Sequence, residues 1–128
     1  MKSTYLYVIL VIALIAGLVF VRNNTDRVAA VTELDSFAQC ITDAGAVFYG
    51  AFWCRHCQAQ KALLKNSSKI PYVECSTTDM RGQTPICIEK GIESYPTWTF
   101  ADGTLGNGEQ TLEQLAEKTG CVLPEATS

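Results

Sequence analysis

An apolar run that leads directly into two closely spaced cysteines constrains the fold of this chain more than any other feature. Residues 46–52 are continuously apolar over the length of a strand, which is typical of a central strand covered on both faces. Trp53-Cys54-Arg55-His56-Cys57 follows at once, and residues 58–65 are good helix formers. The pattern predicts a buried strand that ends where a Cys-Xaa-Xaa-Cys motif opens a helix.

The other elements alternate between helices and strands. We expect a first helix that begins at Thr32 as N-cap and ends at Gly45, strands at 70–74 and 97–100, and helices at 84–90 and 111–120. Residues 101–104 predict a turn into a short edge strand through Leu105. This order predicts an α/β domain with a central mixed sheet flanked by helices, because parallel strands need helical connections and a hairpin does not.

The amino-terminal segment predicts a membrane anchor. No charged residue occurs from Tyr5 to Val21, which is about the shortest length that spans a bilayer as a helix. We expect a tail at 1–4, a transmembrane helix at 5–21 and a polar linker at 22–31. A cleaved signal peptide is the alternative, because Val28-Ala29-Ala30 resembles a cleavage site, although it lies far beyond the apolar run. The flanking charges do not decide the orientation.

Charge and cysteine content bear on partners and compartment. The 10 basic and 13 acidic residues give a net charge of −3 without basic blocks, which disfavours binding to nucleic acid. Six cysteines are many for a reducing compartment. We therefore expect the domain outside the cytoplasm, in the periplasm or at the cell surface if the source is bacterial.

Four cysteines lie outside the motif, and their pairing does not follow from the sequence. Cys75 and Cys87 flank the polar loop from Ser76 to Thr84, so a bridge between them is the most economical choice. Cys40 and Cys121 would then pair with each other, or stay free as core residues at the ends of the first and last helices.

The spacing of Cys54 and Cys57 suits thiol-disulfide exchange. The start of a helix stabilises the thiolate of the first cysteine, and Arg55 and His56 are placed to stabilise it further. Cys54 is the expected nucleophile, and Cys57 is the resolving thiol that attacks the mixed disulfide. A stabilised thiolate makes the disulfide form oxidising, so we expect disulfide donation with no cofactor beyond the Cys54–Cys57 pair.

Two other roles are open to a motif of this kind. A purely structural disulfide here would close so few residues that it would constrain the unfolded chain little. A zinc site needs four ligands, and the only histidine lies inside the motif, so no metal is expected.

Tyr95-Pro96-Thr97 precedes the third predicted strand. Pro96 is either a strand-entry residue or a cis-proline beside the motif that exposes the Tyr95 backbone to an extended peptide. We favour the second interpretation and place Trp53, Tyr95 and Pro96 in the client-binding surface.

Four segments carry a resemblance to a known family: FYGAFWCRHCQAQK, PYVECS, GIESYPTW and LEQLAEKTGC. Over roughly residues 34 to 123 the chain resembles the thioredoxin-like domain found fused to, or encoded beside, bacterial vitamin K epoxide reductase homologues. The resemblance implies a thioredoxin-like fold at 32–123, followed by a tail at 124–128. It also implies that Cys54 and Cys57 exchange disulfides with secreted clients, and that a membrane quinone reductase reoxidises them.

Two positions depart from related patterns. Ordinary thioredoxins have a buried aspartate where this chain has Phe48, which argues against a general cytosolic reductase. Periplasmic disulfide oxidases commonly have Pro-His in place of Arg55-His56.

The sequence leaves two functional hypotheses. The first is an enzyme that oxidises thiols or isomerises disulfides through Cys54 and Cys57. The second is a membrane-tethered module that binds extended peptides in the Pro96 groove without turnover, and the intact pair of cysteines favours the enzyme.

Overall fold

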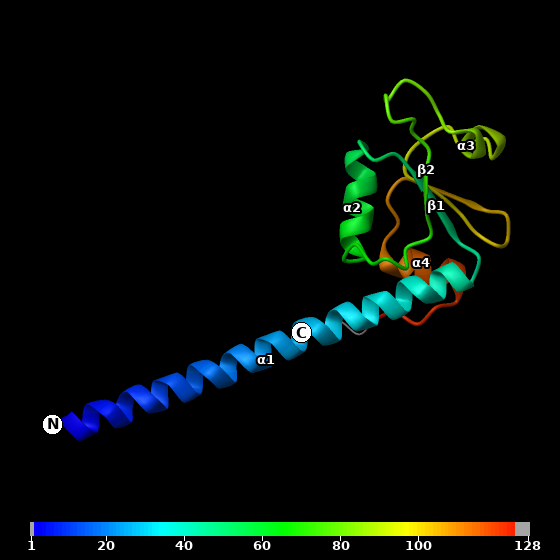
Figure 1. Cartoon of the computed structure of the whole chain (residues 1–128). Helices are drawn as coiled ribbons and strands as arrows, with labels where there is room; N and C mark the ends of the chain where they lie inside the picture. Colours follow the sequence, from blue (N-terminus) through cyan, green and yellow to red (C-terminus); the bar gives the residue numbers. More distant parts are fainter. Residues whose placement is uncertain (1, 125–128) are drawn as a thin grey trace.

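The computed structural model describes residues 2–124, so Met1 and residues 125–128 of the predicted tails lie outside the described residues. Within that range the chain is a mixed α/β structure. Its elements are α1 (Lys2–Asp43), β1 (Val47–Gly50), α2 (Arg55–Leu63), β2 (Tyr72–Glu74), α3 (Pro85–Glu89), β3 (Thr97–Thr99), β4 (Leu105–Asn107) and α4 (Leu112–Thr119). Figure 1 shows α1 extending away from a compact part that holds every other element.

The four strands form one mixed sheet in the order β2-β1-β3-β4. β1 pairs in parallel with β2, and the chain passes through α2 between them. β1 pairs antiparallel with β3, which continues antiparallel to β4. The predicted mixed sheet is therefore present, with β1 inside it and the start of α2 at the end of this inner strand.

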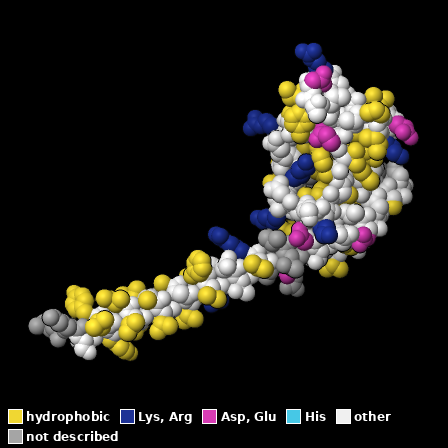
Figure 2. Space-filling model, viewed as in Figure 1, with side chains coloured by type: hydrophobic (Ala, Val, Ile, Leu, Met, Phe, Trp, Pro, Cys, Tyr) yellow, Lys and Arg dark blue, Asp and Glu magenta, His cyan; other side chains and the backbone are white. Residues whose placement is uncertain are grey.

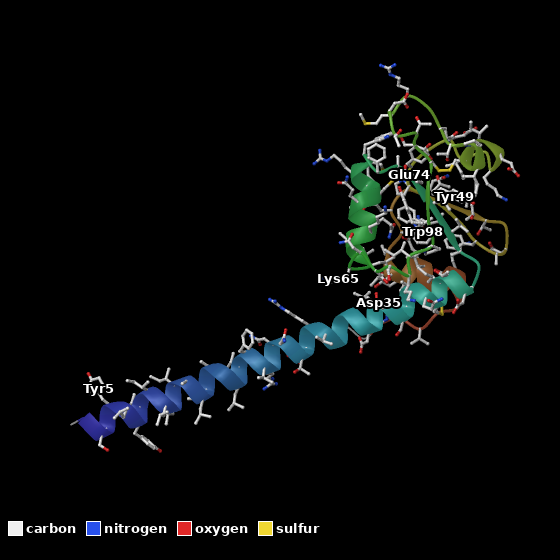
Figure 3. All side chains as sticks on the ribbon, in the orientation of Figure 1. Tyr5, Asp35, Tyr49, Lys65, Glu74 and Trp98 are labelled. Carbon is white, nitrogen blue, oxygen red and sulfur yellow. A yellow bond between two sulfur atoms is a disulfide. The ribbon has the colours of Figure 1, made fainter. Side chains whose placement is uncertain are left out.

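β1 is covered on both faces, as its unbroken apolar sequence predicts. Phe48 packs into the larger core cluster and stacks on Trp98 of β3, with 4.9 Å between ring centroids. Tyr49, the next residue, points to the other side and joins a smaller cluster with Ile92. The alternation of side chains along a strand thus places two apolar clusters on opposite faces. Figure 3 labels Tyr49 and Trp98 in the compact part of the chain.

α1 is one continuous helix, whereas the sequence predicts an anchor at 5–21, a linker at 22–31 and then a new helix from Thr32. Residues 22–31 contain no proline or glycine to end a helix, and the Thr25 hydroxyl donates to the Val21 carbonyl one turn earlier at 2.9 Å. Thr32, the expected N-cap, lies inside α1. The apolar face formed by Leu34, Phe37 and Ile41 is buried in the larger core cluster, as expected.

Among residues 2–124, α1 is the one helix that is long and apolar enough to cross a membrane. Its apolar side chains from Tyr5 to Val21 are exposed, and Figure 2 shows them in yellow along the part of α1 that extends away from the compact part. A signal sequence near the amino terminus passes the same test, so length and composition fit a membrane anchor and a signal sequence alike.

Two disulfides close the domain. Cys40 near the end of α1 is bonded to Cys121, which follows α4, and α1 and α4 lie in contact. Cys75 is bonded to Cys87 of α3, so this bridge spans the polar loop after β2. Among the alternatives that the sequence left open, Cys40 and Cys121 are therefore paired with each other.

Candidate active site

The site lies between the end of β1 and the start of α2. The Cys54 N–H donates to the Ala51 carbonyl at 3.0 Å, which turns the chain tightly after the strand. Cys54 is the N-cap of α2, and its sulfur accepts a hydrogen bond from the Cys57 N–H at 3.2 Å. Both cysteines are free thiols and are buried. The Cys57 N–H belongs to the first turn of α2, where N–H groups have no partner within the helix, and the Cys54 sulfur supplies its acceptor.

Cys57 lies deeper than Cys54 and holds its proton more strongly. Burial raises the pKa of Cys57 to about 12, together with a hydrogen bond to Cys54 and the charge of Cys54. The Ala51 backbone and Lys61 lower this pKa by smaller amounts. A thiol with such a pKa is neutral at physiological pH. The two cysteines of the motif therefore have different environments, and a thiolate at Cys57 needs stabilisation from its surroundings.

Gly50 lets α2 approach the sheet at Cys57. A β-carbon at Gly50 would lie 2.9 Å from the Cys57 sulfur and 2.9 Å from Cε2 of Tyr72. Both distances are shorter than carbon-sulfur and carbon-carbon contacts allow, so any side chain here would displace Cys57 or the Tyr72 ring. The glycine is required by close packing between β1, α2 and β2.

We expect Gly50→Ala to destabilise the domain by about 1–3 kcal/mol, because an added methyl group overpacks the contact between Cys57 and Tyr72. Urea unfolding of the full chain in detergent, followed by tryptophan fluorescence, measures the loss. Gly82→Ala is the matched control, since a β-carbon there would meet Thr77 at ordinary contact distances of 3.5 and 3.6 Å. An equal loss in both variants would contradict the close-packing role of Gly50.

The loop that carries Phe52 and Trp53 is fixed to the end of β2. Oε1 of Glu74 accepts from the Phe52 N–H at 3.2 Å and from the Ser76 N–H at 2.9 Å. Its Oε2 accepts from the Tyr72 hydroxyl at 2.7 Å. The Trp53 indole N–H donates to the Ser76 hydroxyl at 2.8 Å. Glu74, labelled in Figure 3, thus joins the loop before Cys54 to the strand beside it.

On another side of α2, the segment after β4 runs alongside the helix. Nδ1 of His56 lies 2.6 Å from Oε1 of Glu109, in an exposed pair. One turn later, the buried Gln60 accepts from the Gln110 N–H at 2.6 Å and donates to the Gln110 carbonyl at 3.0 Å. The buried amide holds this segment against α2, so Glu109 stays within reach of His56. His56 contacts Glu109, and its expected action on Cys54 stays a prediction.

Five of the residues predicted from sequence gather on one surface. A shallow pocket is lined by Trp53, Cys54, Arg55, His56 and Tyr95. The Trp53 and Tyr95 rings meet edge to face with centroids 6.1 Å apart. Pro96 is buried and does not line this pocket, and the Tyr95–Pro96 peptide bond is cis.

The disulfide-bonded cysteines lie apart from that pocket. Cys75 and Cys87 pack in the smaller cluster, on the opposite face of β1 from Cys57. Within residues 2–124, no group of three or more His, Cys, Asp or Glu side chains is arranged to hold a metal ion.

Sequence reasoning missed Gln60, Lys61, Glu74 and Glu109. The first two follow His56 and Cys57 by four residues on α2, a spacing that places them on the same helix faces and could have identified them. Glu74 and Glu109 reach the motif only through the fold, so no local signal in the sequence indicates them.

The comparison with known proteins agrees with this site chemistry. No family model matches the chain. It is similar to the thiol-disulfide oxidoreductase LTO1 of Arabidopsis thaliana, with 38% identity over 96 residues, which is 71% of this chain and 25% of that protein. The chain thus spans about a quarter of the length of that relative. This similarity supports a relationship to thiol-disulfide oxidoreductases.

Proposed function

We propose that this protein is a thiol-disulfide oxidoreductase that exchanges disulfides with client proteins through Cys54 and Cys57. The observation that carries the proposal is the pair of free thiols at the start of α2, where the Cys57 N–H donates to the Cys54 sulfur. The similarity to a protein named for this activity supports it. The four remaining cysteines are held in disulfides away from the pocket, which leaves this pair for exchange.

The proposed chemistry has two steps. In the dithiol form, the Cys54 thiolate attacks one sulfur of a partner disulfide, which forms a mixed disulfide and releases the other partner sulfur as a thiolate. Cys57 then loses its proton to solvent and attacks the Cys54 sulfur, which closes the Cys54–Cys57 disulfide and releases the second partner sulfur. Run in reverse, the same steps oxidise two client thiols. Trp53 and Tyr95 line the surface against which an extended client chain lies, and the buried Pro96 follows Tyr95 in the chain.

We also propose a thioredoxin-like fold, with residues 5–21 of α1 as an uncleaved membrane anchor and the domain outside the cytoplasm. The sheet order and the position of the motif at the start of α2 support the fold. The two disulfides support an oxidising compartment. A membrane quinone reductase of the vitamin K epoxide reductase type is the partner that we propose for reoxidation, on the basis of the family resemblance.

The test uses the full chain in detergent, in two assays. We expect it to catalyse the reduction of insulin by a dithiol, and to form disulfides in reduced ribonuclease when supplied in its oxidised form. A peptide-binding module without turnover would be silent in both assays. A reduction potential of about −120 mV would identify an oxidase, and a potential of about −270 mV would identify a reductase.

A further inference from the structure

Cys57 has to become a thiolate in a buried position, and the residues around it determine how readily that happens. Its sulfur packs against Gly50 of β1, where there is no charge, and Phe48 and Ala51 in the same strand and turn are apolar. The titratable groups that interact with it are Cys54 at the N-cap of α2, Lys61 of α2 and Tyr72 of β2. Lys61 is the one cation in this set.

Lys61 is held in place by the Tyr72 ring. It follows Cys57 by one helical turn, so both side chains project from the same face of α2. Its ammonium nitrogen lies 3.2 Å from the centroid of the Tyr72 ring, a cation–π contact. The edge of the same ring and the Cys57 sulfur both lie 2.9 Å from the point where a β-carbon of Gly50 would stand. The ammonium group is therefore fixed beside the buried sulfur by a ring that touches the same glycine.

Tyr72 itself is not suited to accept the proton. Its hydroxyl donates to Glu74, and burial together with that carboxylate raises the pKa of Tyr72 far above its usual value. Glu74 in turn is occupied by the Phe52 and Ser76 N–H groups. This network orients the ring under Lys61, so the Ala51 backbone and the Lys61 ammonium charge are the groups that favour a thiolate at Cys57.

The charge of Lys61 matters most in the second step of exchange. In the dithiol form, the hydrogen bond and charge of Cys54 both oppose ionisation of Cys57. Once Cys54 is bonded to a partner sulfur it carries no thiolate, so its charge no longer opposes ionisation. Burial then opposes a negative charge on Cys57, whereas the Ala51 backbone and Lys61 favour it.

We propose that Lys61 is a positioning residue for the resolving step, and that its ammonium group, held over the Tyr72 ring, stabilises the negative charge that Cys57 acquires before it attacks Cys54. This inference rests on the proposed function. It predicts that loss of the charge slows attack by Cys57 and leaves attack by Cys54 unchanged, because Cys54 lies two helical turns from Lys61.

The test is a single-turnover reaction of the full chain with 5,5′-dithiobis(2-nitrobenzoic acid). The chain is prepared with Cys54 and Cys57 reduced and the other disulfides intact, as checked by mass. Attack by Cys54 on the reagent releases one coloured thiolate. Attack by Cys57 on the resulting mixed disulfide then breaks the bond between Cys54 and the reagent, and releases the second. The two phases report the two steps separately.

In Lys61→Met, which keeps the apolar stem, we expect the first phase to stay within about twofold of wild type. The second phase should slow by about tenfold, with its pH profile displaced by about one unit to higher pH, because a tenfold loss of thiolate corresponds to one pKa unit. Lys61→Arg should restore most of the rate. Lys65→Met is the matched control for net charge and should leave both phases unchanged, since Lys65 follows the C-terminal end of α2 (Figure 3), whereas Cys57 lies in the first turn of that helix.

Two outcomes would overturn the inference. One is a Lys61→Met variant whose second phase and pH profile match wild type. The other is an equal slowing of both phases, which would indicate a general change in the structure of α2. Failure of the proposed function looks different, because wild type itself would then be silent in the insulin and ribonuclease assays.

Discussion

Cys57→Ser is expected to accumulate mixed disulfides with client proteins, whereas Cys54→Ser is expected to abolish exchange. Cys54 caps α2, lines the surface pocket and accepts the Cys57 N–H, so it is placed to attack an incoming disulfide. Cys57 does not line that pocket, and burial raises the pKa of its thiol to about 12. It is therefore suited to attack a sulfur already held on Cys54, and its removal leaves the first step intact.

Both variants are to be expressed as the full chain in membranes and compared with wild type on non-reducing gels after thiol alkylation. Reductant-sensitive complexes should be abundant in Cys57→Ser and absent in Cys54→Ser, and turnover of insulin should fall to background in both. Complexes that form equally well with Cys54→Ser would reverse the assignment of nucleophile and resolving thiol.

Removal of the Cys40–Cys121 disulfide is expected to cost about 4 kcal/mol of stability, since a cross-link over a long loop restricts the unfolded chain strongly. This bridge joins residues 81 positions apart, whereas Cys75–Cys87 joins residues 12 apart. The same dependence on loop length gives about 3 kcal/mol for the shorter bridge. Cys40→Ala/Cys121→Ala should therefore be the less stable of the two double variants.

The free energies of unfolding can be measured with urea on the full chain in detergent, by the fluorescence of the buried Trp98. Cys75→Ala/Cys87→Ala serves as the matched control, because it also removes one bridge and two sulfur atoms. A loss for Cys40→Ala/Cys121→Ala no larger than that of the control would show that loop length does not govern the contribution of this bridge.

Local pattern determined much of the fold. The side chains of β1 are covered on both faces, so the strand is apolar throughout and can be recognised from its own residues alone. Thr111 and Gly120 bound α4 as predicted, because caps act within a few residues: Thr111 forms a capping box with Gln114, and Gly120 has a φ of 73°. The boundary at Thr32 was less well determined, since a polar segment without proline or glycine is compatible with either a linker or a helix.

The sequence by itself determined the motif, the helix that it opens and the apolar amino-terminal segment, because each depends on residues that are neighbours along the chain. Only the tertiary structure decided what surrounds the two thiols. Gln60 binds Gln110, which lies 50 residues further along the chain, and this contact keeps Glu109 beside His56. Tyr72 lies under Lys61 because β2 pairs with β1. The pairing of Cys40 with Cys121 was also decided there, since four cysteines allow three pairings until packing brings the ends of α1 and α4 together.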